Sequence, residues 1–286
     1  MKANVHTALK EKTGRKQSGK SDRLSESILA GIRKTEWIGE KTFYFSKVDS
    51  TNTKAKQLAE EGYPSGTLVV AEQQDAGRGR RGRGWESPQG AGIFMTVMLK
   101  PDIEPNNASM LTLVAALAVS AAIRKQTGRP AGIKWPNDIV MNGKKVCGIL
   151  TEMSAQVDYV NHIVVGIGIN VHNESFPEEI AQVATSLYLE TGERWNRAAL
   201  IEEIWEQFER YYAIYLETQD LSGLVKEYDE HLVNRNQIVR VLDPNDPFEG
   251  RAMGITSKGE LVVDTWESRK LVSSGEVSVR GVYGYV

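Results

Sequence analysis

The stretch Asp138-Ile-Val-Met-Asn-Gly-Lys-Lys-Val-Cys-Gly-Ile-Leu-Thr-Glu-Met153 decides the fold class. The Asn142-Gly143 dipeptide in its middle suits the positive φ angles of a two-residue type I′ hairpin turn. The residues on either side, 138–141 and 144–153, are therefore predicted to form antiparallel strands. Neighbouring strands joined by a hairpin, with helices grouped elsewhere, favour an α+β fold over a doubly wound parallel sheet.

Further strands and helices are predicted on both sides of this hairpin. Alternating or continuous apolar residues predict strands over residues 41–48, 67–73, 93–100 and 160–171. Apolar spacing and cap residues predict helices over residues 52–61, 107–125 and 197–217. In the last of these, aromatic and aliphatic residues recur at steps of three and four, so this stripe is expected to face the core.

After Asn236 the pattern changes to short alternating segments. They cover residues 237–242, 248–255, 260–265 and 269–273. This spacing is typical of a small all-β barrel of roughly 50 residues. We therefore expect three parts: a basic, poorly ordered leader over residues 1–23, a main domain over 24–235, and a barrel over 236–286.

Composition excludes several classes of protein. Hydrophobic residues make up 41% and charged residues 25% of the chain, as in ordinary globular proteins. From the sequence we expect no apolar run that approaches the ~18 residues needed to span a membrane. The first residues also lack the apolar core of a signal peptide. A single cysteine, Cys147, excludes an internal disulfide, and the four histidines are scattered, so we expect a cytoplasmic protein without a metal cage.

Positive charge is concentrated at the N-terminus. Residues 1–23 sum to +5 and the rest of the chain to −7. Such a segment can contact nucleic acid, but a solvated leader is the commoner explanation.

The segment Gly77-Arg-Gly-Arg-Arg-Gly-Arg-Gly-Trp85 formally matches the dinucleotide-binding pattern G-x-G-x-x-G. That pattern requires a helix to begin at its third glycine, whereas Trp85-Glu-Ser-Pro88 follows here. A loop with four arginines suits a site that closes over an anionic nucleotide. An RGG-like nucleic-acid segment, or a solvated loop, is the alternative.

A second group of polar residues surrounds the hairpin: Lys134-Trp-Pro-Asn137-Asp138 and Lys145-Val-Cys-Gly148. Alternation along a strand predicts that Lys145 and Cys147 face one way, and Lys144 and Val146 the other. Lys145 is a candidate for fixing an anion, although two lysines after a turn are commonly exposed to solvent. Cys147 alone is more often a buried hydrophobe than a nucleophile. The glycines of Gly166-Ile-Gly168-Ile-Asn170 mark either close approach of a ligand or a bulge.

In order and spacing, five motifs resemble those of biotin protein ligases: Ser50-Thr51-Asn52, GRGRRGRGW, KWPND, K-x-x-GIL-x-E and GIGIN. The resemblance runs from about Leu24 to the C-terminus. It implies a mixed, largely antiparallel sheet packed on helices, of the class II aminoacyl-tRNA synthetase type, with an SH3-like C-terminal barrel. It also implies ATP-dependent activation of biotin to biotinyl-5′-AMP, with Mg²⁺. The biotin then passes to a lysine of a biotin carboxyl carrier protein, or of such a domain in acetyl-CoA carboxylase or another biotin-dependent carboxylase.

The resemblance also implies roles for individual residues. The catalytic residues would be Lys145, Arg78, Arg80 and Asp138. Lys145 would bridge the biotin carboxylate and the α-phosphate, and Asp138 would help the attacking lysine to lose its proton. Toward the biotin head group the substrate-binding set would have Ser50, Thr51 and Gln74, and it also includes Asn52. The closing loop would be Gly77, Arg78, Gly79, Arg80, Arg81, Gly82 and Arg83. Lys145, Gly148 and Gly166 would lie around biotin, Trp85 near adenine, and Asn137, Asn170 and Arg280 near the nucleotide.

Two other functions remain open at this point. A lipoate or octanoate ligase would share the fold, although GRGRRGRGW together with KWPND favours biotin. A nucleic-acid-binding regulator would use the basic leader and the Gly/Arg loop. Several bacterial members of the family begin with a winged helix-turn-helix of about 60 residues. Only about two dozen unpatterned residues precede Leu24, so we expect no specific DNA binding. We also expect no membrane partner. A homodimer is expected from the family resemblance alone.

Overall fold

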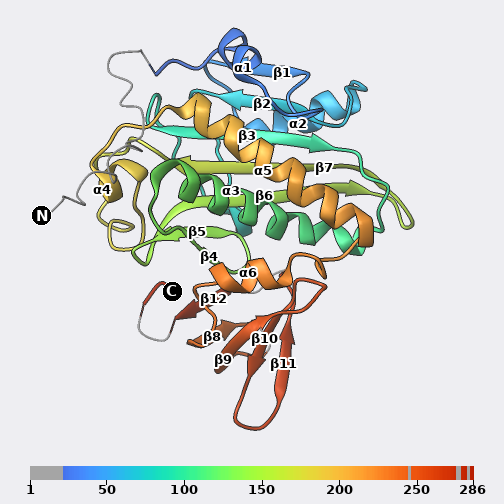
Figure 1. The fold of residues 1–286 in the computed structure, drawn as a ribbon, viewed down its shortest axis with the longest axis vertical. Coiled ribbons are helices and arrows are strands. Elements are labelled where there is room, and N and C mark those ends of the chain that lie inside the picture. Colours follow the sequence, from blue (N-terminus) through green and yellow to red (C-terminus); the bar gives the residue numbers. More distant parts are fainter. Residues whose placement is uncertain (1–21, 244–245, 275–277, 282–283) are drawn as a thin grey trace, which may run out of the picture.

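The computed structural model describes residues 22–243, 246–274, 278–281 and 284–286. Except for its last two residues, the expected basic leader lies outside this range. The described residues form two sheets with helices packed around the larger one (Figure 1).

The larger sheet has seven strands in the order β1-β2-β3-β7-β6-β5-β4. They are β1 (Thr42–Phe45), β2 (Thr67–Ala71), β3 (Gly92–Leu99), β4 (Gly132–Lys134), β5 (Asp138–Met141), β6 (Lys144–Ala155) and β7 (Val160–Asn170). Strands β1 and β2 pair in parallel and every other neighbouring pair is antiparallel. The predicted mixed, largely antiparallel sheet is confirmed.

The hairpin between β5 and β6 has the predicted turn, because Asn142 and Gly143 have φ angles of 47° and 76°. Its pairing contains one irregularity. Ile139 lies opposite Cys147 but Val140 lies opposite Lys145, so β6 has one residue more than β5 across this step. An extra residue of this kind is a β-bulge, and it reverses the alternation of side chains beyond it. The prediction that Lys145 and Cys147 face the same way was therefore wrong: Lys145 is half-buried at a pocket, and Cys147 is completely buried in the core.

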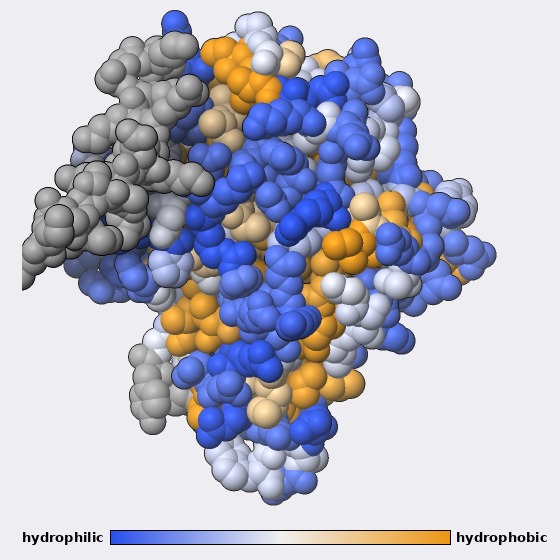
Figure 2. All heavy atoms as spheres, viewed as in Figure 1, coloured by the Kyte–Doolittle hydropathy of each residue, from blue (hydrophilic) through white to orange (hydrophobic). Residues whose placement is uncertain are grey.

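Two long helices, α3 (Leu111–Thr127) and α5 (Arg197–Thr218), cover one face of the sheet, and α1 (Glu26–Ile32) lies beside α5 (Figure 1). The outer surface over α5 is mostly hydrophilic (Figure 2), as its amphipathic pattern predicts. The helix α2 (Thr51–Glu60) packs on the opposite face. Val69 and Val164 point toward α2, whereas their neighbours Val70 and Val165 belong to the core under α3 and α5.

One region, Pro105–Thr127, joins the 3₁₀ helix η2 (Pro105–Met110) to α3. By length and composition it could cross a membrane, so the expectation that no segment approaches this length was wrong. Because 78% of its most apolar window is buried inside the protein, it serves as the central core helix.

The smaller sheet lies beside α6 (Val225–His231), in the order β11-β10-β9-β8-β12 (Figure 1). Its strands are β8 (Ile238–Leu242), β9 (Phe248–Ile255), β10 (Leu261–Asp264), β11 (Arg269–Val272) and β12 (Ser278–Gly281), and all neighbours pair antiparallel. Sequence patterns predicted the first four of these and missed β12. The indole of Trp135 donates a 3.0 Å hydrogen bond to Gly259 O and so links the two sheets. A short helix, α4 (Leu187–Thr191), lies between β7 and α5 in the chain.

Candidate active site

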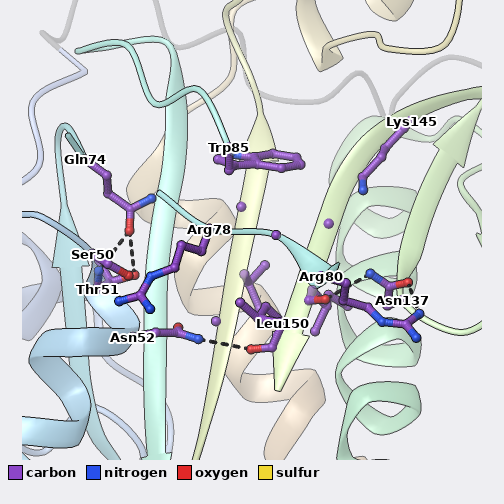
Figure 3. Close-up of a pocket in the computed structure, with 16 residues that line it drawn as sticks. Ser50, Thr51, Asn52, Gln74, Arg78, Arg80, Trp85, Asn137, Lys145 and Leu150 are labelled. Atoms are coloured by element: carbon purple, nitrogen blue, oxygen red, sulfur yellow. Dashed lines mark hydrogen bonds between the residues drawn. The ribbon is translucent and has the colours of Figure 1, made fainter. Parts of the chain in front are cut away.

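A pocket lies on the α2 face of the larger sheet (Figure 3). Its lining comes from the start of α2, the Gly/Arg segment, β6 and β7. The free space measures about 50 Å³, well below the ~300 Å³ or more of a small-molecule site. Side chains of the protein itself therefore fill most of the site.

The floor of the pocket consists of glycines on adjacent strands. Gly148 and Gly168 are direct partners across β6 and β7. A Cβ atom on Gly148 would stand 2.9 Å from the Trp85 ring, and one on Gly168 would stand 2.7 Å from it. At Gly166 a Cβ would stand 2.1 Å from Asn52 Oδ1. The glycines are therefore needed for the close approach of the protein's own side chains, and the interpretation that they admit a ligand stays a prediction.

At one end of the pocket, polar side chains hold α2 to the sheet. Gln74 Oε1 accepts hydrogen bonds from Thr51 N (2.8 Å) and Thr51 Oγ1 (3.1 Å). Asn52 Oδ1 accepts from Thr96 Oγ1 at 2.7 Å, and Asn52 Nδ2 donates to Glu152 Oε2 at 2.8 Å. Ser50 is the N-cap of α2 and also lines the pocket. Apart from Arg78, the pocket-lining side chains at this end are neutral and suit an uncharged polar head group (Figure 3).

The Gly/Arg segment folds back on itself above the glycine floor. Trp85 N donates to Gly77 O at 2.9 Å, and a Cβ on Gly77 would stand 2.5 Å from Trp85 O, so this turn requires a glycine. Arg78 donates a 2.6 Å hydrogen bond to Thr53 Oγ1 in the first turn of α2. Of the four arginines in the Gly/Arg segment, Arg78 and Arg80 line the pocket.

Arg80 bridges three parts of the molecule. Its Nη1 donates to Asn137 Oδ1 at 3.0 Å, and its Nη2 donates to the carbonyl of Ser274, in the smaller sheet's unit, at 2.5 Å. Burial lowers the pKa of Arg80, and the nearby Asp138 carboxylate opposes this shift. Since a guanidinium remains charged even so, a fixed positive charge stands at this end of the pocket.

At the same end of the pocket as Arg80, Lys145 and Asp138 form an ion pair, with Lys145 Nζ 2.6 Å from Asp138 Oδ1. The backbone of Lys145 is fixed from the other side by 2.8 Å bonds to Val183 O and from Thr185 N. Lys145 Nζ also lies 5.3 Å from the centre of the Trp85 ring. An ammonium group is thus held rigidly next to the glycine floor and near Arg80. The pocket can accordingly hold a ligand with a neutral head group at one end and several negative charges at the other.

Comparisons with known proteins identify the family of this chain. Residues 44–170 match the model of the Biotin/lipoate A/B protein ligase family, and residues 236–280 match the Biotin protein ligase C terminal domain. The Bifunctional ligase/repressor BirA of Bacillus subtilis is 40% identical over 262 residues, which cover 91% of this chain and 80% of that protein. The chain belongs to the biotin protein ligase family.

A shorter relative and a solved structure agree with this assignment. The Biotin--[acetyl-CoA-carboxylase] ligase of Paracoccus denitrificans is 32% identical over 242 residues, which cover 82% of this chain and 99% of that protein. The biotin protein ligase from Aquifex aeolicus in complex with biotin and ATP has a TM-score of 0.74 at 31% identity, covering 85% of this chain and 99% of that one.

Within this family member, most residues expected at the site line the pocket. They are Ser50, Thr51, Asn52, Gln74, Arg78, Gly79, Arg80, Trp85, Asn137, Lys145, Gly148 and Gly166. Asp138 joins them through Lys145.

Other expected residues lie outside the pocket lining: Gly77, Arg81, Gly82, Arg83, Asn170 and Arg280. Asn170 Nδ2 donates to Thr185 O at 3.0 Å and so supports the loop that fixes the Lys145 backbone. Arg280 is exposed on β12, and its charge contributes to lowering the pKa of Lys134.

Two residues near Asp138 were not assigned a role from the sequence. Lys134 is 5% exposed, and burial, opposed by Asp138, lowers its pKa to about 8. Tyr285, next to the last residue, donates a hydrogen bond to Asp138 Oδ2. The KWPND motif contained a signal for Lys134, but no local pattern distinguishes Tyr285.

Within the described part of the chain, no three His, Cys, Asp or Glu side chains gather into a group that could hold a metal ion. The nearby oxygens of the kind that Mg²⁺ prefers are those of Asn137 and Asp138.

Proposed function

We propose that this chain is a biotin–acetyl-CoA-carboxylase ligase. It joins biotin to ATP as biotinyl-5′-AMP and then transfers the biotinyl group to a lysine of a carrier protein. The observation that carries the proposal is the glycine floor between a neutral polar end, formed by Thr51 and Gln74, and a cationic end, formed by Arg80 and Lys145.

The first step needs this cationic end. The carboxylate of biotin is a poor acylating agent. Its attack on the α-phosphate of ATP breaks the bond to the β-phosphate, releases pyrophosphate and gives a mixed anhydride, from which AMP leaves in the second step. Several negative charges meet in that transition state, so fixed positive groups stabilise it. We assign this role to Lys145, Arg78 and Arg80. When ligand binds, Lys145 exchanges its contact with Asp138 for the biotin carboxylate and the α-phosphate. Mg²⁺ bound with ATP would neutralise further negative charge on the phosphates.

The second step uses the Asp138 carboxylate, which no longer pairs with Lys145 once ligand is bound. The carrier lysine must be neutral to attack the acyl carbon. Asp138 accepts its proton, because Asp138 Oδ1 lies 2.6 Å from Lys145 Nζ and hence at the reacting end of the pocket. The anhydride also hydrolyses readily, so the Gly77–Trp85 segment must exclude water until the carrier arrives.

The finer assignments belong to the same proposal. We assign the biotin head group to Ser50, Thr51, Asn52 and Gln74, and the nucleotide to Asn137, Asn170, Arg280 and Trp85. The carrier is a biotin carboxyl carrier protein, or such a domain of acetyl-CoA carboxylase or another biotin-dependent carboxylase. The catalytic unit comprises residues 24–235 and the C-terminal unit residues 236–286. The enzyme acts in the cytoplasm, and sedimentation will show whether it is a homodimer.

Substrate trials test the proposal directly. The enzyme with ATP is given labelled biotin, lipoate or octanoate in parallel, and adenylates are separated before and after a carrier domain is added. Biotinyl-AMP should form and then disappear as the carrier becomes labelled. Formation of lipoyl-AMP or octanoyl-AMP in place of biotinyl-AMP would overturn the assignment in favour of the related acyl ligases.

A further inference from the structure

Tyr285 connects the C-terminal end of the chain to the reacting end of the pocket. Its hydroxyl donates a 2.5 Å hydrogen bond to Asp138 Oδ2. The Lys134 ammonium lies 3.5 Å from the centre of the Tyr285 ring, in the geometry of a cation–π contact. Burial and the Asp138 charge raise the pKa of Tyr285, so the hydroxyl keeps its proton and acts as a donor.

The two oxygens of Asp138 therefore have different partners. Oδ2 accepts a hydrogen bond from Tyr285, whereas Oδ1 lies 2.6 Å from Lys145 Nζ in an ion pair and has no hydrogen-bond partner among the described residues. The terminal torsion of an aspartate is broad and roughly two-fold, so a carboxylate held at one oxygen alone can turn. Contacts at both oxygens fix the orientation of the Asp138 carboxylate, and the fixed carboxylate in turn holds the ammonium group of Lys145 in place.

Close packing holds Tyr285 in this place. A Cβ on Gly281 would stand 1.9 Å from Val286 O, so only a glycine in β12 lets the last residues lie so close. The Val286 side chain also approaches the β5–β6 turn, within 3.5 Å of the position of a Cβ on Gly143. The C-terminal residues thus contact the same hairpin that carries Asp138 and Lys145.

We propose that Tyr285 is a positioning residue of the ligase reaction. It orients Asp138 so that Oδ1 faces first Lys145 and then the lysine of the carrier. This inference rests on the roles given to Asp138 and Lys145 under the proposed function. The C-terminal unit accordingly contributes a side chain to the site of the larger sheet.

The variant Tyr285→Phe tests this, because it keeps the ring beside Lys134 and removes only the hydroxyl. Loss of a hydrogen bond to a charged group should lower kcat about tenfold or more in both half-reactions, with KM for biotin and ATP changed less than twofold. The matched control is Tyr44→Phe, which removes a hydroxyl bonded to a carboxylate outside the pocket, at Glu72 (3.3 Å), and should keep wild-type rates. Unchanged kcat in Tyr285→Phe overturns the inference.

A double-mutant cycle separates positioning from a merely structural effect. In an Asp138→Ala background, Tyr285→Phe should cause no further loss in single-turnover rates of the folded protein. An equal loss in both backgrounds would mean that Tyr285 does not act through Asp138. Lys145→Ala separates a failure of this inference from a failure of the proposed function. If Lys145→Ala is fully active, the roles proposed for Lys145 and Asp138 are wrong. If it is inactive while Tyr285→Phe is normal, only this inference fails.

Discussion

The Trp85 indole lies directly on Gly168: its Nε1 and Cε2 are each 2.7 Å from the position of a Cβ on that glycine. Trp85 Nε1 is buried and has no hydrogen-bond partner among the described residues. Leaving a buried donor without a partner costs free energy. Since the free space is only about 50 Å³, we expect Trp85 to leave the floor when biotin enters, which suits the expected place of this ring beside adenine.

Gly168→Val should therefore weaken biotin binding. The added side chain fills the floor, and overpacking of this kind costs about 1–3 kcal/mol. We expect KM for biotin to rise about tenfold or more. Gly31→Ala is the control, because nothing lies within 4 Å of the Cβ that it adds. Unchanged KM in Gly168→Val would show that biotin binds elsewhere.

Lys145→Ala should abolish most adenylate formation and leave the fold intact. Removal of one fixed charged contact to a transition state costs on the order of 3 kcal/mol, or at least a hundredfold in rate. ATP–pyrophosphate exchange in the presence of biotin measures this step. The neighbouring variant Lys144→Ala is the control, because Lys144 bonds instead to Ala181 O, away from the pocket. Wild-type exchange in Lys145→Ala would remove Lys145 from the proposed mechanism.

The Gly77–Trp85 segment should be cut by trypsin more slowly once ligand is bound. Arg81 and Arg83 are exposed in the structure, and a loop that closes over ligand becomes protected. Biotin with a non-hydrolysable ATP analogue should slow cleavage severalfold, whereas the exposed Arg269 of β11 should be cut at the same rate with and without ligand. Equal rates at Arg81 and Arg83 under both conditions would argue against closure.

The stability of the protein should depend on Lys134 at alkaline pH. Burial lowers the pKa of Lys134 to about 8, from about 10.4 in an unfolded chain. Charged Lys134 therefore disfavours folding below pH 8, and this penalty is lost as pH rises from about 8 to 10.4. Relative to Lys134→Met, the wild type should gain on the order of 2–3 kcal/mol in unfolding free energy over that interval. Urea denaturation measures the unfolding free energies of both proteins. If their difference did not change with pH, the lowered pKa of Lys134 would be contradicted.

Local features of the sequence sufficed for much of the architecture. Asn142-Gly143 identified the hairpin because few residues other than asparagine and glycine adopt two successive positive φ angles. The apolar spacing of 197–217 identified α5 to within one residue, because a helix of this length buries a continuous stripe. Five ordered motifs identified the family, because each combines particular residue types at a fixed spacing along the chain.

The tertiary structure decided how these features meet. A single extra residue at Val146 separated Lys145 from Cys147, and strand alternation cannot reveal such a bulge without the partner strand. The strands β4 and β12 escaped prediction, although other strands of four or five residues were predicted. The helices α1, α4 and α6 escaped it because one or two turns carry too little periodicity. Tyr285 meets Asp138 across 147 residues of sequence, and Trp85 meets Gly168 through the folding of the Gly/Arg segment. Contacts of this kind depend on the packing of distant elements against one another, which no local propensity contains.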